Sequence, residues 1–154
     1  MKRIWESIED IVRRVGIALQ PLILLLIRLY WGYEFTRTGV GKFQHFSRII
    51  SYFHSLDIPW PHFFATLTAI TEFSGGICFF LGMYARLSAS SLFCILFVAY
   101  LTAERPVLSA LFTQFDTAAF FASTPFLFTY AVIFIFCFGP GKYSIDFLLR
   151  HKKA

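Results

Sequence analysis

Residues Pro61–Gly82 read PHFFATLTAITEFSGGICFFLG and contain a single charged residue, Glu72. A run of this length matches the ~20 residues with which an α-helix crosses a hydrocarbon core of ~30 Å. Three further apolar runs lie at 17–38, 85–103 and 117–138. These four runs predict four transmembrane helices.

The composition of the whole chain supports a membrane protein. Of the 154 residues, 57% are hydrophobic, 15% are charged and 21 are Phe. Soluble domains are roughly 45–50% apolar and about 25% charged, and an aqueous fold of this size has too little interior to hide so much apolar surface. The predicted fold class is therefore all-α: one integral membrane domain, a four-helix transmembrane bundle with amphipathic surface helices.

Two amphipathic segments flank the first span. Residues 1–15 carry apolar side chains at three- and four-residue spacing and charged side chains on the opposite face, which predicts a surface helix. A docking surface for a partner protein is the alternative interpretation of this segment. Residues 43–56 separate apolar and polar side chains in the same way and predict an outer surface helix. We expect a turn between this helix and the first span, at Thr38–Gly41.

The net charge of +5 points to a lipid bilayer as partner and not to a nucleic acid, because the basic residues lie at the ends of apolar runs. Asp116 is the expected N-cap of the fourth span, Gly139-Pro140-Gly141 ends it, and residues 142–154 form a basic tail. With four spans, both termini lie on the side that carries more Lys and Arg. The positive-inside rule places that side in the cytoplasm.

Two charged residues interrupt the spans, Arg28 in the first and Glu72 in the second. A charge in hydrocarbon costs several kcal/mol and is therefore normally paired. Counted from the outer ends of the two spans, each residue lies roughly 15 Å deep, so adjacent antiparallel helices would bring them together as a bidentate ion pair. The pair is either a strut that fixes the register of two helices or a polar site for a ligand head group or a proton path.

The neighbours of this pair favour a ligand site. Trp31, Gly32 and Lys42 share the helical face of Arg28, and two glycines follow Glu72 by one turn. Small residues allow close helix approach in membranes, or they leave a slot for a flat ring or an isoprenoid tail. The candidate ligand-binding residues are Arg28, Glu72, Lys42, Trp31, Gly32, Gly75 and Gly76.

No self-contained catalytic motif is present: a phosphate-binding loop, a dinucleotide fingerprint and a Ser/His/Asp arrangement are all missing from the sequence. We predict no metal site, because the spacing of His45, His54 and His62 matches no standard ligand pattern. An outer metal site made by these three residues stays open as the alternative. We expect the three cysteines to be small buried hydrophobes: Cys78, Cys94 and Cys137. No intrinsic cofactor is predicted, so any redox centre is borrowed from a lipid-soluble quinone or a partner.

Three motifs, in this order and spacing, resemble the DoxX family. They are RLYWGxxFxxxGxxKF at Arg28–Phe43, EFSGG followed by LGxxxR within Glu72–Arg86, and GPGKYSID at Gly139–Asp146. The resemblance extends over roughly Leu26–Leu149, which is most of the chain.

This resemblance implies a four-helix protein of the bacterial inner membrane. Relatives are described as the membrane subunit of a thiosulfate:quinone oxidoreductase or as the membrane part of thiol- and oxidant-handling complexes. The first hypothesis is therefore a membrane subunit of an oxidoreductase that binds quinone or docks a redox partner, with Arg28, Glu72 and Lys42 at the polar end of the quinone pocket. The alternatives are a non-catalytic accessory subunit of a larger membrane complex and a carrier of small molecules or lipids.

Overall fold

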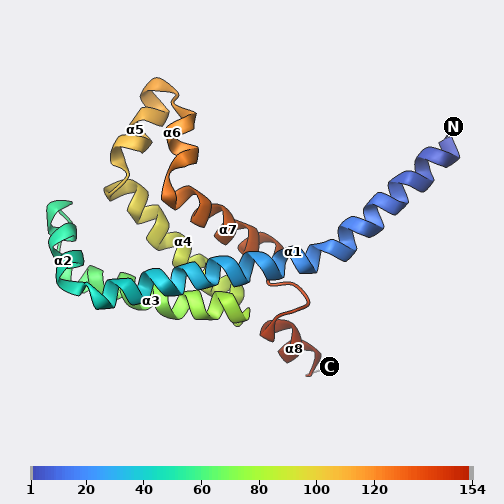
Figure 1. Ribbon diagram of the computed structural model, residues 1–154, viewed down its shortest axis with the longest axis horizontal. Helices are drawn as coiled ribbons and strands as arrows, with labels where there is room; N and C mark the ends of the chain where they lie inside the picture. Colours follow the sequence, from blue (N-terminus) through green and yellow to red (C-terminus); the bar gives the residue numbers. More distant parts are fainter. Residues whose placement is uncertain (1, 153–154) are drawn as a thin grey trace.

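The computed structural model of the protein describes residues 2–152, with side chains from residue 5 onward. This part of the chain contains α-helices and no strands (Figure 1). By length and composition α1, α3 and α4 are able to cross a membrane, and α7 is a shorter apolar helix. The predicted all-α membrane fold is confirmed. The helices are α1 (Lys2–Gln44), α2 (Phe46–Ser55), α3 (Pro61–Leu81), α4 (Ala85–Thr102), α5 (Arg105–Gln114), α6 (Thr117–Ala122), α7 (Thr124–Phe138) and α8 (Ile145–His151).

The first helix is longer than the sequence predicts. The described part of the predicted surface helix and the whole first span belong to one continuous helix of 43 residues, about 65 Å long. The predicted turn at Thr38–Gly41 is wrong, because these residues are helical and α1 ends only at Gln44. A glycine inside a helix costs about 1 kcal/mol, and the packing of Gly39 described below offsets this cost. The N-terminal part of α1 projects away from the other helices (Figure 1), and residues 5–20 are all exposed.

The segment between the first two spans contains the expected amphipathic helix in shortened form. Phe46, Ile49 and Phe53 are half-buried, whereas the polar residues of α2 are exposed. Pro61 occupies the first turn of α3, where its missing N–H costs nothing. Gly82 ends this helix in the left-handed conformation, with φ of +66°, and so turns the chain directly into α4.

The fourth span is divided into two helices. The predicted range 117–138 coincides with the start of α6 and the end of α7, but Ser123 between them is extended. Pro125 accounts for this break, since proline has no N–H and disfavours the helical conformation in the residue before it. Asp116 caps α6 as the sequence predicts, because its carboxylate accepts a hydrogen bond from the Ala119 N–H at 3.2 Å.

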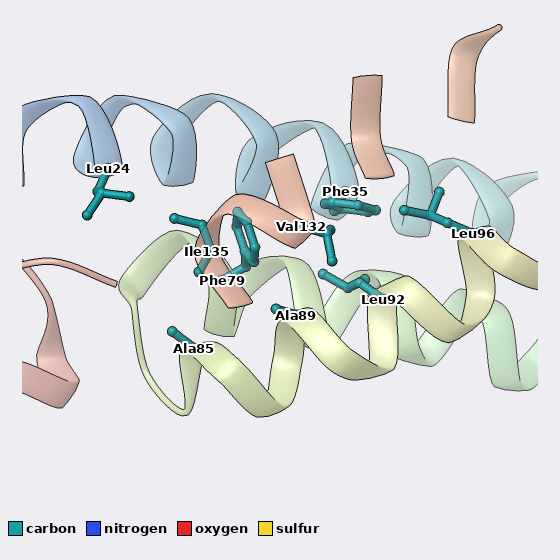
Figure 2. Close-up of a cluster of buried hydrophobic side chains, with 9 residues drawn as sticks. All are labelled: Leu24, Phe35, Phe79, Ala85, Ala89, Leu92, Leu96, Val132 and Ile135. Carbon is teal, nitrogen blue, oxygen red and sulfur yellow. The ribbon is translucent and has the colours of Figure 1, made fainter. Parts of the chain in front are cut away.

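Helices α1, α3, α4 and α7 share one core (Figure 2). At its centre the Phe35 ring lies edge-on to Phe79 at 6.2 Å and to Phe128 at 4.9 Å. Edge-to-face aromatic pairs add about 0.5–1.5 kcal/mol beyond the area that they bury, and packing of this kind drives helix association where lipid removes the hydrophobic term. The buried cluster comprises Leu24, Phe35, Phe79, Ala85, Ala89, Leu92, Leu96, Val132 and Ile135.

Candidate functional site

Helices α1 and α3 are in close contact along a seam of glycines. A Cβ atom on Gly39 would lie 2.6 Å from the Phe73 nitrogen, and one on Gly32 would lie 2.7 Å from the Phe80 Cα atom. Only a residue without a side chain permits this approach of two backbones. The glycines on α1 are therefore helix-packing positions.

The glycines that follow Glu72 are equally enclosed. A Cβ atom on Gly76 would lie 2.6 Å from the Thr36 nitrogen of α1, and one on Gly75 would lie 3.2 Å from the Leu92 side chain of α4. Neighbouring helices thus fill the space that a flat ring would need. The sequence allowed the interpretation that these glycines leave a slot for a ligand between the spans. The structure contains no such slot at Gly75 and Gly76, because neighbouring helices fill the space.

The same contacts fix the register of the two helices. They place Glu72 opposite Val40 and Arg28 opposite the turn between α3 and α4. At 1.5 Å per residue, the twelve residues from Arg28 to Val40 separate the two charged levels by about 18 Å. The predicted Arg28–Glu72 ion pair is therefore wrong. The depth estimate counted from Thr38 as the end of the first span, whereas α1 continues to Gln44.

Glu72 has a different partner, Lys42, whose ammonium group donates a hydrogen bond to its carboxylate. The Glu72 side chain is 10% exposed and the Lys42 side chain 21%. The rings of Phe43 and Phe73 meet beside this pair at 6.3 Å. We call this the α2 end of the seam; it carries a closed ion pair, which is how an ionised group inside a bundle is normally satisfied.

Arg28 lies at the opposite end of the seam, the Arg28 end, and is 1% exposed. Its Nη2 donates a hydrogen bond to the carbonyl oxygen of Tyr143, while Nε and Nη1 have no partner in the described part of the chain. The guanidinium lies against Gly82, where a Cβ atom would come within 1.8 Å of Nη1. The carboxylate that acts on it electrostatically is Asp146. Arg28 is thus held by residues after α7 and not by Glu72.

The C-terminal segment, Gly139–Arg150, is fastened to the turn between α3 and α4. The Asp146 carboxylate accepts hydrogen bonds from the N–H groups of Tyr84 at 2.8 Å and Ala85 at 2.9 Å, and so caps α4. The Asp146 N–H donates to the Gly82 carbonyl at 3.0 Å. Sequence reasoning missed this role; the signal was the position of Asp146 after the Gly-Pro-Gly stop, where a folded-back segment needs an anchor.

A cavity of about 710 Å³ lies between α1, the α3–α4 turn and the C-terminal segment. A second cavity, of about 470 Å³, lies between α1 and α7. Both are lined by Ile17, Gln20, Leu24 and Phe138, so they adjoin along one face of α1. Arg28 lines neither cavity; it is buried one turn after Leu24, behind the shared wall.

The family model described as DoxX matches residues 23–105, which is more than half of the chain. The chain belongs to the DoxX family. The matched range includes Arg28, Lys42 and Glu72. The C-terminal segment, which forms one wall of the larger cavity, lies after this range in the sequence. Neither a curated protein nor a solved structure matches this DoxX chain.

The remaining candidates of the DoxX chain lie apart from the cavities. Trp31 is half-buried and its ring meets Phe128 at 4.8 Å, so it packs in the core.

Across residues 2–152 no group of three or more His, Cys, Asp or Glu is arranged to hold a metal ion. The prediction that all cysteines are buried is wrong: Cys78 is half-buried, while Cys94 and Cys137 are exposed on apolar helices.

Proposed function

We propose that this DoxX-family protein is the membrane subunit of an oxidoreductase system and binds a quinone in the cavity between α1 and the C-terminal segment. The observation that supports this proposal is the pair of adjoining cavities, of about 710 and 470 Å³. A quinone combines a ring with two carbonyl acceptors and a long apolar tail. The larger cavity offers polar side chains to the ring, and the smaller one offers an apolar groove to the tail.

The residues of the cavities fit such a ligand. Gln20 lines both cavities and is exposed, so its amide group is positioned to donate a hydrogen bond to a ring carbonyl. Ile23, Phe134 and Phe138 line the groove and supply apolar contacts for the tail. Arg28 keeps a fixed positive charge behind the wall. A bound quinone supplies the acceptor for electrons that a partner protein delivers, while the chain itself binds and orients the ring.

The candidate set from the sequence changes accordingly. Lys42 and Glu72 pair with each other at the α2 end, about 18 Å along α1 from the Arg28 level. The glycines are packing positions in this proposal, and Gln20 replaces them as the residue that contacts the ligand.

We further propose that both termini lie in the cytoplasm of a bacterium and that the protein resides in the inner membrane. The α3–α4 turn and the C-terminal segment are joined by hydrogen bonds, so they lie at one end of the bundle, and the N-terminal part of α1 extends from that end (Figure 1). Lys and Arg are concentrated in these three regions, and the positive-inside rule assigns them to the cytoplasm. The cavity then opens at the cytoplasmic leaflet.

The test is a quinone measurement on full-length protein purified from the native membrane in mild detergent. Quinone is extracted and quantified by mass spectrometry per mole of protein, for wild type, Gln20→Leu and Gln44→Leu. Gln44 is the matched control, since it is an exposed amide on the same helix outside both cavities. We expect Gln20→Leu to lower bound quinone about ten-fold, the worth of one hydrogen bond of roughly 1.4 kcal/mol. Wild-type protein without quinone, or equal losses in both variants, would contradict the proposal.

A non-catalytic accessory subunit is the second candidate function, favoured by one feature of α1. Its N-terminal part presents the exposed apolar residues Trp5, Ile8 and Val12, and none of the other described helices lies against this part (Figure 1). Removal of residues 2–14 distinguishes the two functions. Loss of a co-purifying protein, together with wild-type protein that carries no quinone, would favour the accessory role.

A further inference from the structure

We propose that the mouth of the larger cavity binds the phosphate head group of an anionic phospholipid. Three cations from two separate parts of the chain line this cavity: Arg86 at the start of α4, and Lys142 and Arg150 in the C-terminal segment. The Arg86 guanidinium lies 3.8 Å from the position of a Cβ atom on Gly139, so it reaches across to that segment. This proposal does not depend on quinone binding.

The cavity cations differ from the ion-paired basic residues of the described chain, because they have no carboxylate partner. Elsewhere three basic side chains form ion pairs with carboxylates, whereas within residues 5–152 none of the three cavity cations does so. The paired cations are Arg13 with Asp10, Arg37 with Glu34, and Lys42 with Glu72. The cavity cations therefore remain available to an anion from outside the chain.

The only carboxylate among the residues that line this cavity in the described structure is Asp146. Both of its oxygens already accept N–H groups at the start of α4, from Tyr84 and Ala85. Three cations and one occupied carboxylate leave the cavity positive, and Arg28 adds a further charge behind the wall. Charges of one sign on the low-dielectric walls of a cleft focus an electric field that attracts an ion of the opposite sign.

The apolar residues beside the cations indicate a lipid and not a soluble anion. Leu87 is 69% exposed and Leu149 is 51% exposed, and both line the same cavity. A phospholipid whose phosphate contacts the three cations would have its acyl chains over these leucines. Basic pockets between transmembrane helices at the cytoplasmic side suit anionic head groups in this way. A neutral quinone ring makes no comparable use of three cations, and the groove proposed for the quinone tail is lined by Ile23 and Phe134 and by none of these three cations.

The experiment uses full-length protein in a neutral detergent, to which phosphatidylglycerol or phosphatidylcholine is added. Retained lipid is counted by native mass spectrometry, and the thermal midpoint is recorded in parallel. We expect wild type to retain phosphatidylglycerol in preference to phosphatidylcholine and to be stabilised by it. The triple variant Arg86→Gln/Lys142→Gln/Arg150→Gln should lose roughly 100-fold in apparent affinity for phosphatidylglycerol, because each of the three cations contributes about 1 kcal/mol near an anionic lipid.

The matched control is Arg14→Gln/Arg48→Gln/Arg105→Gln, which removes the same charge from three exposed positions outside the cavities. The single variant Lys142→Glu serves as a second test, should the triple variant lack the helical content of wild type. Equal losses in the cavity and control variants, or no preference between the two lipids, would overturn the proposal. Equal stabilisation by glycerol phosphate, which has no acyl chains, would overturn the assignment of a lipid. The readout here is retained phospholipid and not retained quinone, so this test can fail or succeed independently of the previous one.

Discussion

The two ends of the α1–α3 seam each bury a charged residue, and they satisfy it in opposite ways. At the α2 end, Glu72 pairs with Lys42 across the two helices. At the Arg28 end, the guanidinium donates to a main-chain carbonyl and leaves two nitrogens without a partner in the described structure. The first arrangement is complete within one pair of helices, while the second depends on a segment that follows α7.

The two buried charges therefore differ in how much of their hydrogen-bonding capacity is used inside the protein. A carboxylate that is paired and almost enclosed contributes to helix register and offers little to a ligand. A buried cation with unused donors beside two cavities keeps a positive field at the membrane interface. We therefore expect the two ends to respond differently to mutation.

The largest expected effect is at Gly82, which touches the Arg28 guanidinium. Gly82→Ala places a Cβ atom 1.8 Å from Nη1 and a side chain at a φ of +66°. A non-glycine residue in this conformation costs about 1–2 kcal/mol, and displacement of the guanidinium brings the total loss to about 3 kcal/mol or more. Thermal unfolding in detergent, followed by circular dichroism, measures this change.

The matched control is Gly41→Ala at the α2 end, where no atom lies within 4 Å of the added Cβ. Because alanine favours a helix over glycine by about 1 kcal/mol, this variant should be as stable as wild type or slightly more stable. Equal midpoints for the two variants would contradict the tight contact between Gly82 and Arg28.

Double-mutant cycles test which charges interact. Lys42→Met combined with Glu72→Gln should give a coupling free energy of about 1–2 kcal/mol, between the values for exposed and buried pairs. Arg28→Met combined with Glu72→Gln should be additive within about 0.5 kcal/mol, because the residues lie at levels about 18 Å apart. A larger coupling free energy in the second cycle would support the Arg28–Glu72 ion pair predicted from the sequence and contradict the register described above.

The anchor of the C-terminal segment is expected to contribute less to stability than the contact at Gly82. Asp146→Ala removes two hydrogen bonds at the start of α4 and should destabilise the protein by about 1–2 kcal/mol. Limited trypsin digestion at Lys142 should become faster, as the segment is released. Asp116→Ala, which removes one capping bond from α6, is the control and should cost about 0.5–1 kcal/mol without changing cleavage at Lys142.

Features that depend on neighbours in sequence could be predicted, and features that depend on helix register could not. Pro61 at the start of α3 and Asp116 at the start of α6 act on the backbone next to them, so the sequence alone places them. Glycine is typical of turns, but Gly39 is helical because Phe73 packs against it. That contact lies 34 residues away in the chain, and no local pattern contains it.

The candidate site shows the same division. Charged residues inside apolar runs are conspicuous in the sequence, and Arg28 and Glu72 were found in this way, whereas Lys42 was found because it continues the helical face of Arg28. Their partners follow from contacts between distant segments: Lys42 with Glu72 over 30 positions, and Arg28 with Tyr143 over 115. Gln20 was missed because an exposed amide in the first span carries no signal until the C-terminal segment closes a cavity around it.

The separation between Arg28 and its acceptor also sets an order in time. Tyr143 is 115 residues after Arg28, so a ribosome working at about 5–20 residues per second makes it on the order of 10 s later. During that interval α1 is already synthesised, while its guanidinium has no carbonyl to receive it. The C-terminal segment therefore completes the surroundings of a helix that was made long before it, and the bundle closes around Arg28 only after Tyr143 has been synthesised.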